Sequence, residues 1–170
     1  MHRFIHALAR LTALVGGLVL IALIALVSIS ITGRWFGVGE ITGTYELLEA
    51  GVAFAIFSFL PITQFYGAHA TVDVFTMALP DRVTRWIKAF WEVVLALVIL
   101  LIIWRLFEGM QRYIGNGETT FFLQFPVWWG YAASFASGLV ACTIAIYCAF
   151  ARIKEAVLGQ NILPSEQESA

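Results

Sequence analysis

The chain has 170 residues, of which 61% are hydrophobic and only 12% are charged, and its formal net charge is −1. This composition is far too apolar for a soluble domain of this size. It predicts an integral membrane protein, and the short chain leaves almost no mass for domains outside the bilayer.

Four apolar stretches are candidates for membrane-spanning helices, each of which needs about 20 mostly apolar residues. Three are free of charge, and the third in chain order is shorter, but Lys88, Glu92 and Arg105 flank it where long side chains reach the interface. We predict an all-α integral membrane protein with a single four-helix domain over residues 1–155 and a polar tail over 156–170. The helices are expected at about 11–32, 46–66, 84–108 and 127–151.

The first stretch, residues 11–31 behind Arg3 and Arg10, has a secretory signal peptide as its alternative interpretation. The run exceeds the core of about 7–15 residues that such signals have, and Ser28-Ile29-Ser30 is a weak cleavage pattern. An anchor that stays in the membrane is the favoured interpretation.

The second stretch opens with Thr44 as the expected N-cap, followed by Glu46 and Glu49 in the first turns. Carboxylates suit the positive end of a helix. The alternative is an ion or proton site, because an acid inside a membrane is a functional candidate by default. Their position near the interface favours helix-dipole complementation or a subunit contact.

Pro61 lies in the second half of the same stretch and removes one backbone hydrogen bond, which predicts a kink. Thr63 and Gln64 follow it and are expected to satisfy freed backbone groups or to bond a neighbouring helix.

The next loop predicts a short amphipathic helix over residues 71–79, lying on the cytoplasmic membrane surface and ending at Pro80. His69 and Asp73 are four residues apart, and a hydrogen-bonded pair that fixes the loop is the economical interpretation. A metal site is the alternative, but it lacks further ligands nearby.

The fourth stretch begins after an aromatic segment with Pro126 and Trp128, and small residues then recur at every fourth position. Such a row lets another helix approach closely. Packing within the four-helix set and docking on a second membrane protein are both open. The row consists of Gly130, Ser134, Gly138 and Cys142.

The distribution of Lys and Arg predicts the orientation. With four spans both termini share one side, and seven basic residues fall on that side against three on the other. The positive-inside rule then places both termini in the cytoplasm.

The sequence shows no phosphate-binding loop, no metal-ligand cluster, no activated nucleophile and no pair of intramembrane histidines for haem. We therefore expect no enzymatic activity, no cofactor and no nucleic-acid partner. Broken-helix repeats of a self-sufficient transporter are also missing, which indicates an accessory membrane subunit.

Three short motifs then resemble a known family. Tyr45-Glu46-Leu47 opens the second helix, and Thr119 or Thr120 followed by Pro126-Val127-Trp128 opens the fourth. Between them, Gly67, His69, Val72 and Asp73 form a Gly-x-His-x-x-Val-Asp motif followed by Leu79-Pro80. Over about residues 10–155 the chain is similar to the small membrane subunit, the DctQ component, of tripartite ATP-independent periplasmic (TRAP) transporters. Where such proteins often have basic residues in or before the central motif, this chain has Ala70-Thr71 and Gln64-Phe65-Tyr66.

The resemblance implies a non-catalytic permease subunit in the bacterial inner membrane, surrounded by membrane lipids. Similar proteins pair with a large membrane subunit that carries out sodium-coupled transport of organic acids, and with a periplasmic solute-binding protein. The small subunit would brace the former and help to dock the latter. The alternative is a homo-oligomeric small channel or transporter.

Overall fold

The computed structural model describes residues 2–37, 39–66 and 81–158. Its helices are α1 (His2–Trp35), α2 (Thr44–Tyr66), α3 (Asp81–Asn116) and α4 (Trp128–Leu158). All four are long and apolar enough to cross a membrane. The described residues contain no strand, only one isolated bridge, so the all-α prediction with four membrane-spanning helices is confirmed. The interfacial helix expected over 71–79 and most of the polar tail lie outside the described residues.

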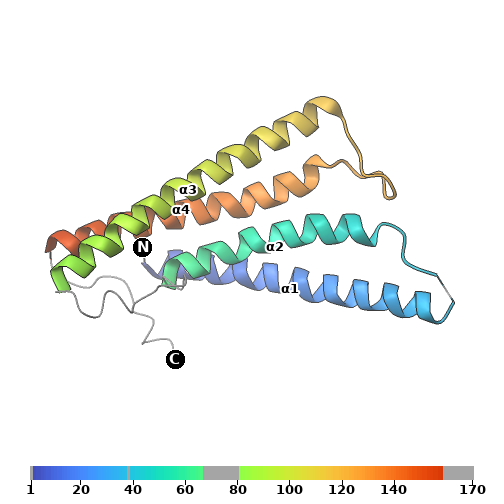
Figure 1. Cartoon of the computed structure of the whole chain (residues 1–170), viewed down its shortest axis with the longest axis horizontal. Coiled ribbons are helices and arrows are strands. Elements are labelled where there is room, and N and C mark those ends of the chain that lie inside the picture. Colours follow the sequence, from blue (N-terminus) through green and yellow to red (C-terminus); the bar gives the residue numbers. More distant parts are fainter. Residues whose placement is uncertain (1, 38, 67–80, 159–170) are drawn as a thin grey trace.

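The helices run up and down and lie side by side in the order α1, α2, α4, α3 (Figure 1). The start of α1, the end of α2, the start of α3 and the end of α4 lie together at what we call the terminal end. The opposite end carries the α1–α2 connection and the long α3–α4 loop, and we call it the hairpin end. The side of the membrane that each end faces stays a prediction.

The helices extend beyond the apolar runs from which they were predicted. α1 begins at His2 rather than near 11, α3 spans 81–116 rather than 84–108, and α4 continues to Leu158 rather than 151. Charged residues mark where a helix leaves the hydrocarbon, but Arg, Lys and Glu are good helix formers and do not end the backbone hydrogen bonding.

α4 is the central helix of the bundle. In its most apolar window 39% of residues are buried, against 17% in each of the other three helices. One buried cluster joins α4 to α1 and α2, and a second joins it to α3. The first comprises Ala9, Phe65, Ile144, Cys148 and Ala151, and the second comprises Ile99, Ile103 and Ala145. The outward faces of α1 and α3 expose many Leu, Ile, Phe and Trp side chains, which suits contact with lipid or with another membrane protein.

Small residues bring the helices together inside the bundle. A Cβ at Gly16 of α1 would lie only 2.7 Å from Ser58 Cβ of α2, so the two backbones approach closely there. The Ser58 and Ser137 hydroxyls lie 3.1 Å apart and connect α2 to α4. Close packing of this kind drives helix association in lipid, where helices gain nothing from hiding apolar surface.

Candidate functional site

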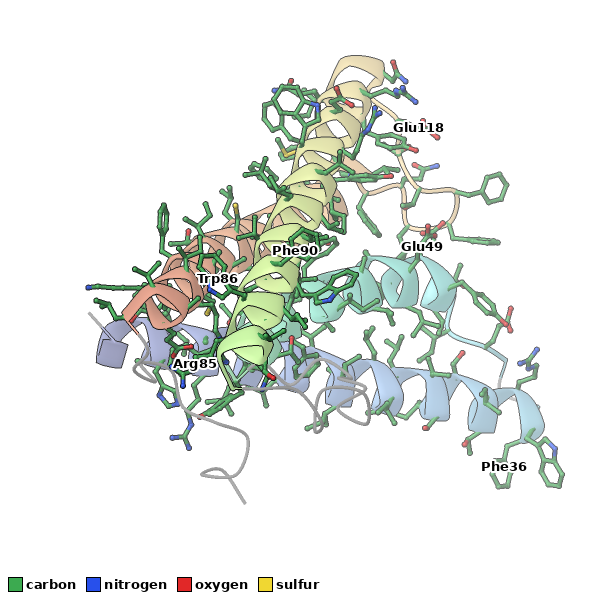
Figure 2. All side chains as sticks on the ribbon, turned by 60° about the vertical axis from the view of Figure 1, so that its left-hand side comes forward. Phe36, Glu49, Arg85, Trp86, Phe90 and Glu118 are labelled. Atoms are coloured by element: carbon green, nitrogen blue, oxygen red, sulfur yellow. The ribbon has the colours of Figure 1, made fainter. Side chains whose placement is uncertain are left out.

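The α3–α4 loop folds back on itself as a short hairpin over residues 118–127. Thr120 N–H donates to the Phe125 carbonyl at 2.9 Å, and Val127 N–H donates to the Glu118 carbonyl at 3.1 Å. Glu118 and Glu49 both lie at this end of the molecule (Figure 2). The tip of the hairpin is apolar and exposed: Phe121 is 84% accessible, and its ring meets that of Phe122 edge to face at 5.1 Å.

Glu46, in the first turn of α2, holds this tip in place. Its Oε1 accepts the Phe122 N–H at 2.6 Å and its Oε2 accepts the Leu123 N–H at 2.9 Å. Successive backbone N–H groups form a concave site that suits an anion, and bonds to a charged acceptor are stronger than neutral ones. The carboxylate therefore connects the start of α2 to a loop more than seventy residues away in the sequence.

A close packing contact lies beside this bond. Gly43 precedes α2 with φ +81°, and a Cβ there would clash with the Leu123 side chain. Glycine is thus required both by the backbone conformation and by the approach of the hairpin.

The start of α2 is also fixed to α1. Ser30 Oγ accepts the Ile41 N–H at 3.1 Å and lies 3.2 Å from the Thr44 hydroxyl, which donates its one proton to the Ile41 carbonyl at 2.6 Å. The expected N-cap role of Thr44 is wrong: it is the first helical residue, its hydroxyl bonds the preceding loop, and the Gly43 carbonyl accepts the Leu47 N–H.

The other predicted residues of the hairpin end divide into two groups. Thr119 and Pro126 form an isolated antiparallel β-bridge, and Trp128 begins α4. The family motif at the start of the fourth helix therefore forms the base of the hairpin. Tyr45 is 71% exposed and Glu49 is also exposed, and neither side chain makes a hydrogen bond or ion pair with any described residue.

The small-residue row of α4 lies against helices of the same chain. A Cβ on Gly130 would be 3.2 Å from Ala50 Cβ of α2, and one on Gly138 would be 3.2 Å from Ile103 Cγ1 of α3. Ser134 between them is 1% exposed, and its hydroxyl has no hydrogen-bond partner among the described residues. These contacts favour packing within the four-helix set over the alternative of docking on a second protein.

Sequence reasoning missed most of a partly buried group of polar side chains at the terminal end. Gln64 of α2 donates to Glu92 of α3, and Arg152 donates to Glu155 of α4 at 2.9 Å. Gln64 and Glu155 are only 1% and 4% exposed. Thr63 bonds carbonyls of its own helix, so of the two residues after Pro61 it is Gln64 that reaches a neighbouring helix.

A second missed contact lies next to this group. His6 Nε2 lies 2.7 Å from the Tyr66 hydroxyl, which joins the start of α1 to the end of α2. The sequence did contain one indication of these contacts, which is the position of the residues along the membrane normal. The polar residues of four different helices all fall near the same predicted membrane boundary, namely His6, Gln64, Glu92 and Arg152.

The central motif, formed by Gly67, His69, Val72 and Asp73, lies outside the described residues. Within the part of the chain that is described, no group of three or more His, Cys, Asp or Glu residues could coordinate a metal ion.

The geometry is that of a packed helical bundle with a fixed, exposed loop and a large apolar surface. Among curated proteins, no match to the chain reaches significance. Residues 23–155, most of the chain, match the family described as tripartite ATP-independent periplasmic transporters, DctQ component. The chain therefore belongs to the DctQ family, the small membrane subunit of TRAP transporters.

Proposed function

We propose that this chain is the non-catalytic small permease subunit of a sodium-coupled TRAP transporter for organic acids in the bacterial inner membrane. In this proposal it braces the large membrane subunit and helps to dock the periplasmic binding protein. The observation that carries the proposal is the hairpin fixed by Glu46, which presents an exposed apolar tip beyond a tightly packed bundle.

A bracing role needs a rigid body with an outer surface free for a partner. The bundle interior is joined by close contacts such as Gly16 with Ser58, whereas the flanking helices α1 and α3 leave apolar faces uncovered. Trp86 and Phe90 lie on such a face of α3 (Figure 2). We expect part of this surface to contact the large subunit and the remainder to contact membrane lipids.

A docking role needs a fixed feature on the periplasmic side. With both termini in the cytoplasm, as the basic residues predict, the hairpin end faces the periplasm. Phe121 at the tip is an exposed aromatic side chain of the kind that anchors protein interfaces. The two bonds to Glu46 already order the hairpin, so binding a partner costs less conformational entropy.

The first test is affinity purification of the chain from its native membrane in mild detergent, with mass spectrometry of the proteins that accompany it. We expect a large multi-spanning subunit in near-equal amount. Recovery of a homo-oligomer alone would instead support the alternative of a small channel or transporter that forms its own pore.

The docking role is tested separately by Phe121→Ala, with Phe90→Ala as the matched control. Phe90 is also well exposed, at 62%, but lies in the half of α3 nearer the terminal end. In reconstituted complexes, Phe121→Ala is expected to weaken binding of the periplasmic protein about tenfold, while Phe90→Ala leaves it unchanged. If both variants bound the periplasmic protein with equal affinity, the hairpin tip would not be part of the docking surface. The proposed bracing role would be unaffected by that result.

A further inference from the structure

A hollow of about 290 Å³ lies between the last turns of α1 and the start of α2. Its walls include the side chains of Val27, Ile31 and Leu48, and Phe122 of the hairpin lines it as well. An apolar recess at a helix end, close to where the chain leaves the bilayer, is suited to the first carbons of a lipid chain.

Two opposite charges line the same hollow. Arg34 Nη1 lies 3.6 Å from Glu40 Oε2, and the two side chains are 60% and 54% exposed. At this distance the pair makes no short hydrogen bond, and an exposed ion pair of this kind adds little to stability. The five N–H donors of the guanidinium and the acceptors of the carboxylate are therefore available to a ligand.

We propose that this hollow binds a phospholipid with an ethanolamine headgroup from the leaflet at the hairpin end. The lipid phosphate lies against Arg34, its ammonium donates to Glu40, and its acyl chain begins over Val27 and Ile31. The proposal depends neither on the orientation of the chain nor on its role in docking.

Charge complementarity selects this headgroup over the other common ones. An adjacent positive and negative side chain match a phosphate and an ammonium on one molecule. A phosphatidylglycerol headgroup has the phosphate, but it offers Glu40 only neutral hydroxyl groups and no positive charge. A phosphatidylcholine headgroup has the positive charge, but its quaternary nitrogen has no N–H to donate.

The test uses the full chain, purified with the proteins that accompany it, freed of lipid in detergent and supplied with equal amounts of phosphatidylethanolamine, phosphatidylglycerol and phosphatidylcholine. Native mass spectrometry measures the lipid retained. We expect phosphatidylethanolamine to be retained best, and Arg34→Gln and Glu40→Gln each to weaken its retention about tenfold, since each removes one charged hydrogen bond.

Arg112→Gln and Glu118→Gln are the matched controls, because both residues are exposed charges at the same end but neither lines the hollow. Ile31→Trp, which fills the hollow without changing its charge, is expected to reduce retention of all three lipids. Equal retention of the three lipids, a preference for phosphatidylglycerol, or unchanged retention in both charge variants would overturn the proposal. Circular dichroism and recovery of the intact complex show that each variant is folded.

Discussion

Inside the bundle, Gly16, Ser58 and Ser137 bring the backbones of α1, α2 and α4 close together in a buried position. At the hairpin end, by contrast, Glu46 on α2 holds a loop through two N–H groups in an exposed position. Both contacts join segments that are distant in the sequence, but only the first is sealed from its surroundings.

The two regions differ in whether water can replace a contact that a substitution removes. A clash or an unpaired polar group inside the bundle has no water to relieve it, so its cost reaches the stability of the whole domain. An N–H group released at the hairpin end is hydrated at once, so the loss is mainly one of local order. Substitutions in the two regions should therefore separate global from local effects.

The largest effect is expected for Gly16→Ala, because Ser58 Cβ at 2.7 Å cannot rotate away and α1 and α2 must separate. Overpacking of this kind lowers the free energy of unfolding by about 1–3 kcal/mol. Gly17→Ala is the control, since its Cβ would meet only Phe59 Cζ at an ordinary 3.9 Å. Unfolding in detergent with increasing dodecyl sulfate measures both variants, and equal stability of the two would contradict the close approach of the helices.

The second effect concerns the partly buried bond between Gln64 and Glu92. Gln64→Leu leaves the carboxylate without this donor and is expected to lower the free energy of unfolding by about 2 kcal/mol. Glu92→Leu is compared with it in a double-mutant cycle, also measured by unfolding in dodecyl sulfate. The double variant should lose less stability than the sum of the single variants, whereas strict additivity would show that the two side chains are not coupled.

The sequence was sufficient to predict the four helices and the membrane as their surroundings. Long runs of apolar residues indicate the membrane, and in lipid the backbone of such a run must satisfy its own hydrogen bonds, which it does as a helix. Helix ends such as His2 and Asn116 were less predictable, since charged residues that leave the bilayer continue a helix readily. The spacing of the α4 row indicated close packing, but the partners Ala50 and Ile103 depend on how the other helices are arranged in space.

The hairpin end shows where sequence reasoning stops. Glu46 was selected as a residue of the helix start and of a family motif, and a helix-dipole role needs only local sequence. Its bonds to Phe122 and Leu123, however, require a loop conformation that brings two amides to face one carboxylate. Likewise Gly43 carries no sequence signal for Leu123, because the contact exists only once the hairpin has folded over α2.

The third effect tests the packing of the hairpin on α2. Gly43→Ala combines a positive φ, which costs of order 1 kcal/mol for a residue with a Cβ, with a clash against Leu123. Gly37→Ala is the control, since it has φ +74° but open space around its Cβ. Limited proteolysis should cut the hairpin faster in Gly43→Ala than in Gly37→Ala. Equal cleavage would show that the approach of Leu123 does not hold the hairpin.

The smallest change in global stability is expected for Glu46→Gln. The amide keeps one oxygen acceptor but loses the charge, so the bonds to Phe122 and Leu123 weaken and the helix start loses its dipole partner. Glu49→Gln is the matched control, because it removes a carboxylate one turn further along α2 that does not bond the hairpin.

Hydrogen exchange measured by mass spectrometry distinguishes the two variants. In Glu46→Gln, peptides covering residues 119–125 should exchange faster, since the two amide groups held by the carboxylate open more often once the charge is lost. Peptides from the interior of α4 should keep their protection in both variants. If Glu46→Gln instead lowered protection in α4, the hairpin would be coupled to the bundle interior, and the separation between an exposed local contact and a buried global one would not hold for this protein.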